Sequence, residues 1–558
     1  MKAPNQTDHP VEAQLPFERP SPSGLKWLLL AVLFCAWMIP GLVGRDPWKA
    51  DETYSFGLVL NMIETGEWVV PRVGADPVME KPPIFYCTAT LFARLLSPPL
   101  AVHDAARAAS ALYMVLTLLF VALASRELNG RGTGWVAAVL LLGCLGNVHS
   151  AHLLVTDNSL LTGFALALYG LSLGHQRPWI AGLLCGTGAG LAFLSKGLLG
   201  LGVIGIAVAC LPLLLKAWRT RAYVRLVSAM ALAALPWLVI WPLLLYQRSP
   251  ALFMVWFWNN NVERFIGAGL GKSNTTPLHY LIQLPLAAWP VFPLAFWTLW
   301  RGSRRALQHE NVRLPLLYFA VILAVLSVAG QRRSNYMPPM FLPLALLAVR
   351  SVDSFSGRAA KAINLRCFTI FSFMAAIVWF AWSAQFTGFP GAVLDIIRNQ
   401  VPDYVPRLQH VPVGVAFAAT LGWALLCIFH RGQSRFVAMH WTAGVTLTYL
   451  LGMTLWLPVT NQNMTYRDDF VGLREALGKH PGMVGSRGLG ETQRAMVHYY
   501  AGVRPASEEI RGPLHCRWML IQGRDEEGRR PQAPDPSWRL VWQGAHHQEL
   551  FHLYHRGP

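Results

Sequence analysis

The chain has 558 residues, of which 54% are hydrophobic and only 14% are charged, and its formal net charge is +18. A soluble chain carries nearer a quarter charged residues, so this composition excludes an ordinary soluble protein. In a soluble protein this excess of basic residues would suggest nucleic-acid binding. In an apolar chain it indicates instead that Lys and Arg lie in cytoplasmic loops. The eight cysteines lie mostly in apolar runs and show no disulfide framework and no metal-ligand spacing.

The predicted elements begin with a polar, proline-rich segment, residues 1–24, which is typical of a disordered cytoplasmic tail. Runs of about twenty apolar residues then recur between residues 25 and 459, and they predict about thirteen transmembrane helices. The expected spans lie near residues 25–44, 106–125, 133–148, 158–173, 179–194, 198–215, 226–246, 277–300, 314–330, 336–349, 367–386, 412–429 and 438–457.

The character of the chain changes after the last expected span. Strand-like runs such as "CRWMLIQG" and "WRLVWQG" and a helix-like run, "ETQRAMVHYYAG", follow one another. Residues 460–558 therefore predict a small α/β domain outside the membrane. The fold class that we expect is an α-helical polytopic membrane protein with this C-terminal domain attached.

Lys and Arg gather in alternate loops, for example at Arg126, Lys216, Arg301, Arg350 and Arg431. Loops with this bias face the cytoplasm. An N-terminus inside and an odd number of spans then place the C-terminal domain on the outer side.

The loops of the outer face carry ionisable residues at the edges of the apolar spans. The longest of these loops, residues 45–105, contains "KADETYSF" and "VMEKPPIF". Ionisable residues at a membrane edge are costly and are functional candidates. The candidates on this face are Asp51, Glu52, Tyr54, Glu80, Lys81, Asp157, Lys196, Arg264, Arg332, Arg333 and Tyr336.

The cations in this set suit a phosphate, because Arg offers paired hydrogen bonds and Lys a point charge. Carboxylates such as Asp51 and Glu80 can act as a general base, orient the cations or bind a metal ion. Anions and cations together at a membrane surface suggest a reaction on a lipid phosphate.

Each candidate also has a structural alternative. Asp51 and Asp157 can stabilise the start of a helix. Glu80 and Lys81 precede two prolines and can belong to a solvated turn. Lys196 can reach the interface along its aliphatic chain. "NNN" at residues 259–261 indicates a loop.

The sequence resembles the bacterial aminoarabinose transferases (ArnT) and, more broadly, the protein O-mannosyltransferase-like branch of GT-C glycosyltransferases. The resemblance rests on "ADETYSFGLVLNMIETGEWVVP", "MEKPP", "TDNSLL", "LSKG", "VERF" and "RRSNYMPP", which follow one another in the family's order. It implies a GT-C fold and an integral membrane enzyme that uses a polyprenyl-phosphate sugar outside the cytoplasmic membrane. In the family the donor is undecaprenyl-phosphate aminoarabinose and the acceptor is a lipid A phosphate.

The resemblance also implies roles for particular residues. Asp51 matches the acidic residue at the catalytic centre, and Asp157 matches the acidic residue of the second outer loop. Glu80 and Lys81 match the pair beside the carrier phosphate. The positions that match contacts to the lipid phosphate are Lys196, Arg264 and Tyr336.

The chain departs from the family pattern at two places. Tyr54 and Ser55 stand where the family has Arg-Tyr, and Asn260 and Asn261 stand where it has Glu-His. The family's histidine is implicated in metal binding, so the sequence leaves the cofactor open: a divalent metal is possible, but the expected His is Asn261.

The prediction is therefore an inverting glycosyltransferase of the bacterial inner membrane that moves a sugar from undecaprenyl phosphate to an extracytoplasmic acceptor, with a lipid A phosphate favoured. Three alternatives stay open. The sugar can pass to a protein or glycan hydroxyl, the chain can be a flippase for a lipid-linked sugar, or it can be a membrane-anchored assembly protein. A transporter would also show charges at mid-span and symmetry between two halves, and neither is visible in the sequence.

Overall fold

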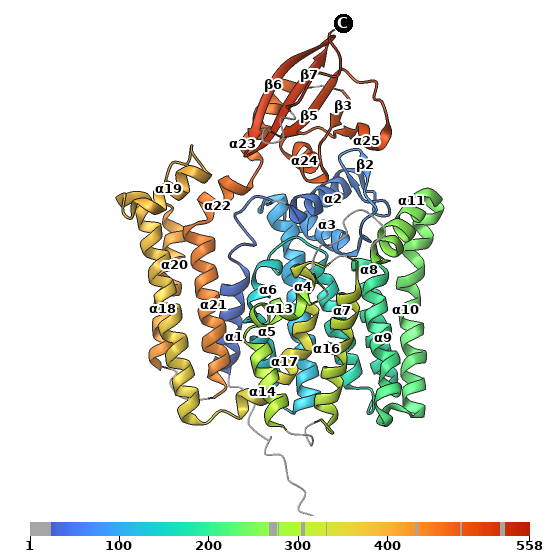
Figure 1. The fold of residues 1–558 in the computed structure, drawn as a ribbon, viewed down its shortest axis with the longest axis vertical. Coiled ribbons are helices and arrows are strands. Elements are labelled where there is room, and N and C mark those ends of the chain that lie inside the picture. The colour runs from blue at the N-terminus through green and yellow to red at the C-terminus, as the bar shows by residue number, and fades with distance from the viewer. Residues whose placement is uncertain are drawn as a thin grey trace, which may run out of the picture.

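The computed structural model describes residues 24–557 except 49, 267–275, 277, 303–306, 331, 430–433, 480–481 and 525–529. Almost all of the predicted cytoplasmic tail thus lies outside the described residues. The described chain forms a tall helical bundle with a sheet domain at one end, and helix α1 begins near the opposite end (Figure 1).

The bundle is built from helices whose apolar residues are continuous enough to cross a membrane or to pack inside one. Its helices are α1 (Gly24–Met38), α4 (Val102–Asn129), α5 (Gly134–Leu142), α6 (Leu145–Ser150), α7 (Asp157–Ser172), α8 (Pro178–Lys196), α9 (Leu198–Leu214), η1 (Lys216–Trp218), α10 (Arg221–Arg248), α13 (His279–Ala287), α14 (Val291–Arg301), α16 (Glu310–Val328) and α17 (Pro338–Asp353).

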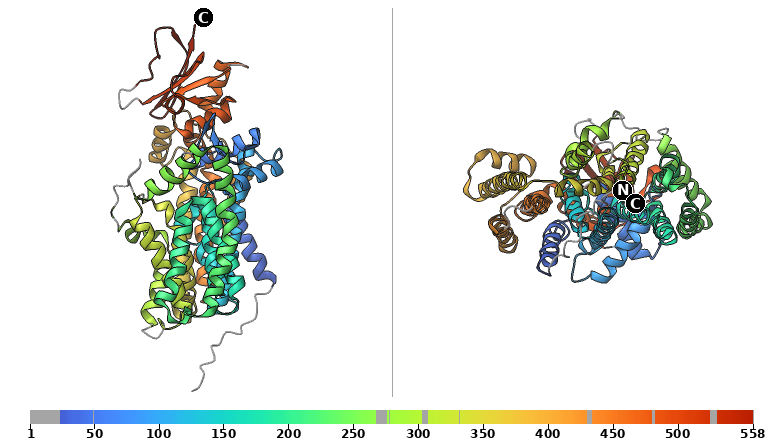
Figure 2. Two further views of the ribbon diagram at one scale, coloured as in Figure 1. Left: turned by 90° about the vertical axis from the view of Figure 1, so that its right-hand side faces the viewer. Right: turned by 90° about the horizontal axis from the view of Figure 1, so that it is seen from below.

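A second group of helices follows at the side of this bundle. It consists of α18 (Gly357–Thr387), α19 (Gly391–Gln400), α20 (His410–Phe429), α21 (Phe436–Leu455) and α22 (Leu457–Met464). Seen from below, α18 and α20 protrude to one side (Figure 2). They pack on α21 around a separate apolar cluster that includes Phe371, Trp423 and Leu451.

Each of the thirteen predicted spans contains a helix or two consecutive helices. Within the described chain, seven helices are long and apolar enough to cross a membrane, or eight if the pair α13 and α14, bent by 101°, forms one span. The protein is thus a multi-pass membrane protein, and the count of about thirteen crossings stays a prediction.

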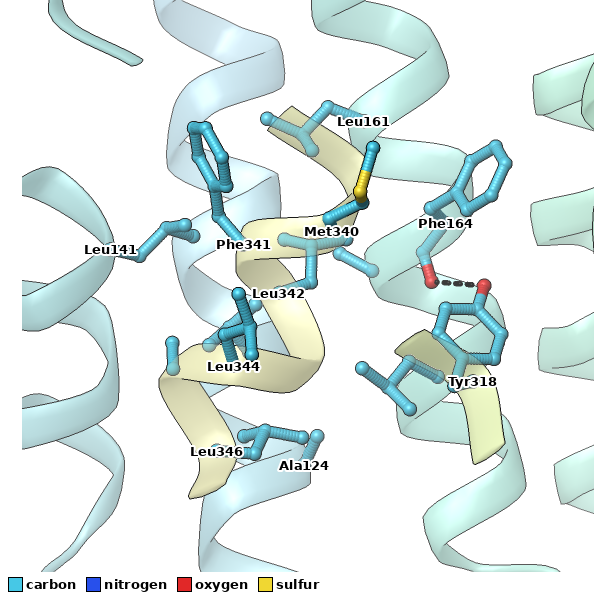
Figure 3. Close-up of a cluster of buried hydrophobic side chains, with 14 of the residues drawn as sticks. Ala124, Leu141, Leu161, Phe164, Tyr318, Met340, Phe341, Leu342, Leu344 and Leu346 are labelled. Carbon is cyan, nitrogen blue, oxygen red and sulfur yellow. Dashed lines mark hydrogen bonds between the residues drawn. The ribbon is translucent and has the colours of Figure 1, made fainter. Parts of the chain in front are cut away.

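The core of the bundle forms around α17, which is buried along nearly its whole length. Phe341, Leu342 and Leu346 of α17 lie among side chains of the neighbouring helices (Figure 3). Tyr318 of α16 donates its buried hydroxyl to the carbonyl of Phe164 in α7 at 3.1 Å. The apolar contacts and this hydrogen bond fix these helices relative to one another.

The loops at the upper end contain short elements of their own (Figure 1). These are α2 (Asp51–Thr65), β1 (Arg72–Val73), β2 (Asp76–Pro77), α3 (Ile84–Leu96), α11 (Pro250–Met254), η2 (Val255–Glu263), α12 (Arg264–Ile266) and η3 (Ser334–Tyr336). The asparagine block expected in a loop lies instead inside η2, which is a π-helix. A π-turn is a helical feature often found at functional sites.

The C-terminal region forms a five-stranded mixed sheet in the order β4-β3-β5-β7-β6. Its elements are α23 (Arg467–Leu477), β3 (Val484–Arg487), α24 (Glu491–Met496), η4 (Val497–Ala501), β4 (Ala506–Ser507), α25 (Glu508–Arg511), β5 (Trp518–Arg524), β6 (Trp538–His546) and β7 (Glu549–Arg556). Strands β3 and β5 pair in parallel with Val484 opposite Trp518, and β5 pairs antiparallel to β7 with Leu520 opposite Leu553. The strand-like and helix-like runs expected here are present, whereas the short β4 and the final strand β7 were not predicted.

Candidate functional site

A pocket of about 390 Å³ lies where the loops at the upper end meet α9 and α16. Its polar lining consists of Glu80, Lys81, Lys196, Asn260, Asn261, Arg264 and Tyr336. Its apolar lining includes Leu199, Gly202 and Ile206 on α9, Val325 on α16 and Ala329 directly after α16. Because a helix rises 1.5 Å per residue, Ile206 lies roughly 12 Å along α9 from its first residue, Leu198. The pocket thus joins a charged end to an apolar groove.

Lys196 and Asp157 form an ion pair in the charged part of the pocket, and each lies at the terminus of a helix. Lys196 is the last residue of α8 and Asp157 is the first of α7. The Lys196 ammonium donates to the Asp157 carboxylate at 2.6 Å and lies 3.9 Å from the ring centroid of Tyr336. Asp157 makes no capping hydrogen bond, and the N-cap position belongs to Thr156.

Glu80 and Arg264 form a second ion pair across the pocket. The Arg264 guanidinium donates to the Glu80 carboxylate at 2.7 Å. Burial raises the pKa of Glu80, but the charges of Lys81 and Arg264 outweigh burial and lower that pKa from its ordinary value of 4.5 to about 2. Glu80 therefore stays ionised at physiological pH.

Lys81 differs from these cations, because no carboxylate of the described chain lies within ion-pair distance of its ammonium. The ammonium lies 5.4 Å from the ring centroid of Tyr54. Burial lowers the pKa of Lys81, whereas the negative charges of Glu80, Asp157 and Asp51 raise it, and the net shift is upward. Lys81 is thus a fixed cation in the pocket wall that still lacks a contacting anion.

Asp51 and Tyr54 lie on the first turns of α2, beside the pocket wall. The helix begins at Asp51, whose carboxylate has no hydrogen-bond or ion-pair partner within the described residues. Tyr54 is buried, with 4% of its surface exposed. Burial and the charges of Glu80 and Glu491 raise the pKa of its phenol, so Tyr54 stays protonated.

The "LSKG" and "NNN" motifs hold the pocket wall together. Gly197 has φ +65°, and a β-carbon there would lie 1.9 Å from the Asn261 side-chain oxygen. That oxygen accepts from the Leu198 amide at 2.9 Å, at the start of α9. Asn260 donates to the Met79 carbonyl at 3.1 Å, next to Glu80. Asn261 therefore has a structural partner at the position where the family has its histidine.

Glu52 is not brought to the pocket. Its carboxylate, 1% exposed, pairs with Arg45 and with Arg107. It also accepts from the amides of Trp48 at 3.1 Å and Leu154 at 3.2 Å. Burial raises the pKa of Glu52, but the charges of Arg107 and Arg45 outweigh burial and lower that pKa. Glu52 thus fixes the start of the long outer loop on α4, and substrate has no access to its carboxylate.

Arg332 and Arg333 also lie away from the pocket lining. Arg332 donates to the carbonyls of Ser327 at 3.0 Å and Ala329 at 3.3 Å, at the end of α16. Arg333 is exposed, and only Tyr336 of this segment lines the pocket. Within the part of the chain that the structure describes, no group of three His, Cys, Asp or Glu side chains is arranged to hold a metal ion.

Sequence reasoning missed Glu491, which belongs to α24 of the sheet domain. The charges of Glu80, Lys81 and Arg264 act on its carboxylate. Glu491 is separated from Glu80 by about four hundred residues of chain, and no pattern along a sequence links positions so far apart. Its nearness to the site follows only from how the sheet domain docks.

Residues 80–244 match the family described as dolichyl-phosphate-mannose-protein mannosyltransferase. The chain is 29% identical over 350 residues to the undecaprenyl phosphate-alpha-4-amino-4-deoxy-L-arabinose arabinosyl transferase of Edwardsiella ictaluri, and the match covers 61% of each chain. It is 26% identical over 444 residues to the enzyme of the same name from Yersinia enterocolitica, covering 77% of this chain and 76% of the relative. The match to the Edwardsiella enzyme thus spans less than two thirds of that protein.

The fold is similar to a crystal structure of ArnT from Cupriavidus metallidurans bound to undecaprenyl phosphate. The TM-score is 0.70 at 17% identity, with 95% of this chain and 98% of the other covered. The chain thus shares the fold of this polytopic membrane protein. It is similar in sequence to aminoarabinose transferases, and the resemblance inferred from the order of its motifs is confirmed.

Proposed function

We propose that the protein is a glycosyltransferase of the bacterial inner membrane that moves a sugar from undecaprenyl phosphate to an extracytoplasmic acceptor. The observation that supports this most is the pocket. One end of the pocket carries the cations Lys81, Lys196 and Arg264, and the adjoining wall is formed by apolar residues of α9 and α16. A ligand that matches both parts has an anionic head and a long hydrocarbon chain. A polyprenyl phosphate has that form, and the curated relatives are named for undecaprenyl phosphate donors.

The proposed reaction is a single displacement with inversion at the anomeric carbon. An acceptor oxygen forms a bond to that carbon while the bond to the phosphate oxygen breaks. The electron pair leaves with undecaprenyl phosphate, whose growing negative charge is met by Lys81, Lys196 and Arg264. Preorganised charge of this kind usually lowers the barrier of an enzymatic reaction more than any other single effect.

Asp51 serves the acceptor side of this reaction. A hydroxyl acceptor must lose a proton, and the unpaired carboxylate of Asp51 can receive it. A phosphate acceptor is already ionised, so Asp51 then positions the sugar. The relatives' names favour an aminoarabinose donor, and we propose a lipid A phosphate as the acceptor.

The proposed topology places the pocket and the sheet domain outside the membrane and the N-terminus inside. The chain then divides into the tail (1–24), a transmembrane transferase region (25–459) with its long outer loop (45–105), and the sheet domain (460–558). Lys and Arg in the opposite loops support this orientation. Labelling of single cysteines placed at Arg72 and Arg219 in intact cells tests it, and label at Arg219 from outside would contradict it.

The direct test is a transfer assay with the purified full-length chain in lipid nanodiscs. Undecaprenyl phosphate carrying 4-amino-4-deoxy-L-arabinose is supplied with lipid A. We expect mass spectrometry to detect lipid A with one added amino sugar and an equal amount of free undecaprenyl phosphate, and NMR of the product to show an inverted anomeric centre. Absence of both transfer and donor cleavage would contradict the proposed function, and retention would contradict the single displacement.

A further inference from the structure

Helix α24 of the sheet domain rests against the start of α2, where Asp51 and Tyr54 lie. Thr492 donates its hydroxyl to the carbonyl of Ala50 at 3.2 Å. A β-carbon placed on Gly57 of α2 would lie 2.5 Å from the β-carbon of Ala495, so the two helices touch closely. The position of Glu491 is therefore set by direct packing against the element that carries Asp51.

The same helix is held from the side of Glu80 and Lys81. Arg494 of α24 pairs with Asp76 of β2 at 2.6 Å, and the side chains are 4% and 0% exposed. Strand β2 ends at Pro77, three residues before Glu80. Because α24 is held by α2 and by β2, it has little freedom to shift relative to the pocket wall.

The carboxylate of Glu491 is half-buried, and no donor of the described chain lies within hydrogen-bond or ion-pair distance of it. Burial and the charge of Glu80 raise its pKa, and Arg494, Lys81 and Arg264 oppose that rise. A partly buried carboxylate without a contacting partner carries a desolvation cost that a cation could relieve.

The charges around the site are paired unevenly. Glu80 is paired with Arg264 and Asp157 with Lys196. Lys81 has no contacting anion, and Asp51 and Glu491 have no contacting cation within the described residues. A ligand with a phosphate alone would satisfy Lys81 and leave both carboxylates unmatched. A ligand that carries an ammonium as well as a phosphate would match both kinds of charge.

We propose that Glu491 is a specificity-determining residue of the sheet domain that receives the protonated amino group of an amino sugar while the cations of the pocket hold its phosphate. The assignment rests on the proposed function, because it names the residue through which that site distinguishes an amino sugar from a neutral one. It also gives the sheet domain a part in substrate selection.

The test compares two donors with the purified full-length chain. One is undecaprenyl phosphate carrying 4-amino-4-deoxy-L-arabinose, and the other carries L-arabinose with a hydroxyl at the same position. For Glu491→Gln we expect kcat/KM for the amino donor to fall about 10- to 100-fold and kcat/KM for the neutral donor to change less than about threefold, as expected when a charged hydrogen bond is lost. Glu491→Asp keeps the charge and should restore part of the preference.

The ratio of the two values is independent of the fraction of folded enzyme, so a partial loss of folding does not affect it. Glu475→Gln, an exposed glutamate of α23 in the same domain, is the matched control and should leave the ratio unchanged. Equal losses with both donors in Glu491→Gln would overturn the assignment alone. Failure of the unmodified protein to use either donor would instead overturn the proposed function and the assignment together.

Discussion

Lys81 illustrates how a single residue can indicate a ligand. The half-buried ammonium has an aromatic ring 5.4 Å away but no carboxylate of the described chain in contact. Its neighbours Lys196 and Arg264 each have an ion-pair partner at 2.6 and 2.7 Å. A cation that is charged, partly buried and unpaired is best satisfied by an incoming anion.

Replacing Lys81 tests this interpretation at the residue scale. Lys81→Ala should lower kcat/KM for the polyprenyl-phosphate donor by about 100- to 1,000-fold, because it removes a charge that stabilises the leaving phosphate. Steady-state kinetics of the purified variant measures the change. Lys479→Ala, at an exposed lysine of the sheet domain, is the control, and equal kinetics for both variants would exclude Lys81 from the phosphate site.

The pKa of Glu80 gives a second prediction. The pKa of the Glu80 carboxyl in the folded protein is lowered from 4.5 to about 2. The stabilisation that its charge provides is therefore complete above pH 4.5 and is lost as the pH falls through about 2. Glu80 cannot be a general acid at neutral pH. Glu80→Gln should lower kcat/KM by the same factor across roughly pH 5 to 8 and leave the acidic limb of the profile in place. Disappearance of that limb in the variant would show that Glu80 titrates in the reaction.

At the scale of elements, the site depends on how helix ends meet. Helix α8 ends at Lys196, and α9 begins two residues later after a glycine with φ +65°. The side chain of Asn261 from the π-helix η2 fills the space beside that glycine and accepts from the first amide of α9. The tight turn thereby directs Lys196 toward Asp157 and Tyr336.

Gly197→Ala tests the turn. A non-glycine residue at φ +65° and ψ −143° costs roughly 1–3 kcal/mol, and the added β-carbon would also displace Asn261. We expect a lower thermal unfolding temperature in nanodiscs and a loss of donor affinity. Gly205 lies within α9, the helix that follows Gly197, with open space around it, so Gly205→Ala should be neutral or slightly stabilising. Equal behaviour of the two variants would refute the role of the turn.

At the scale of the whole molecule, the sheet domain is fastened to the long outer loop by ion pairs. Asp76 is fully buried and pairs with Arg494 and Arg511, each at 2.6 Å. Arg467 pairs with Asp46 near the start of that loop. Apolar contacts accompany these pairs, because one buried cluster includes Phe56 of α2 together with Phe470 and Phe551 of the sheet domain. The domain and the loop therefore behave as one packed unit.

Asp76→Asn should loosen this unit. Removing one partner of a buried ion pair costs on the order of 3–5 kcal/mol, because the other charge stays buried without compensation. Hydrogen exchange followed by mass spectrometry should show faster exchange in α24 and in β4, where the Ser507 amide donates to Asp76. Arg504→Gln removes a more exposed pair with Glu64 and should have a small effect. Unchanged exchange in Asp76→Asn would show that apolar packing alone holds the domain.

The sequence by itself determined the class of fold and most of the polar pocket residues. Each expected span contains a helix, and six predicted residues line the pocket or contact its wall: Tyr54, Glu80, Lys81, Lys196, Arg264 and Tyr336. Hydropathy and motif order are local properties, so they can be read along the chain. The catalytic and binding roles of these residues stay predictions.

Only the tertiary structure decided which charges meet. It placed Glu52, adjacent to Asp51 in sequence, in a buried pairing with Arg107, and it left Arg332 outside the pocket lining. It also brought Glu491 to the site from the far end of the chain. Neighbouring residues of a helix point in different directions, and the docking of distant segments depends on packing between surfaces. Neither the direction of a side chain relative to the pocket nor the docking of a distant segment can be predicted from the local pattern of residues.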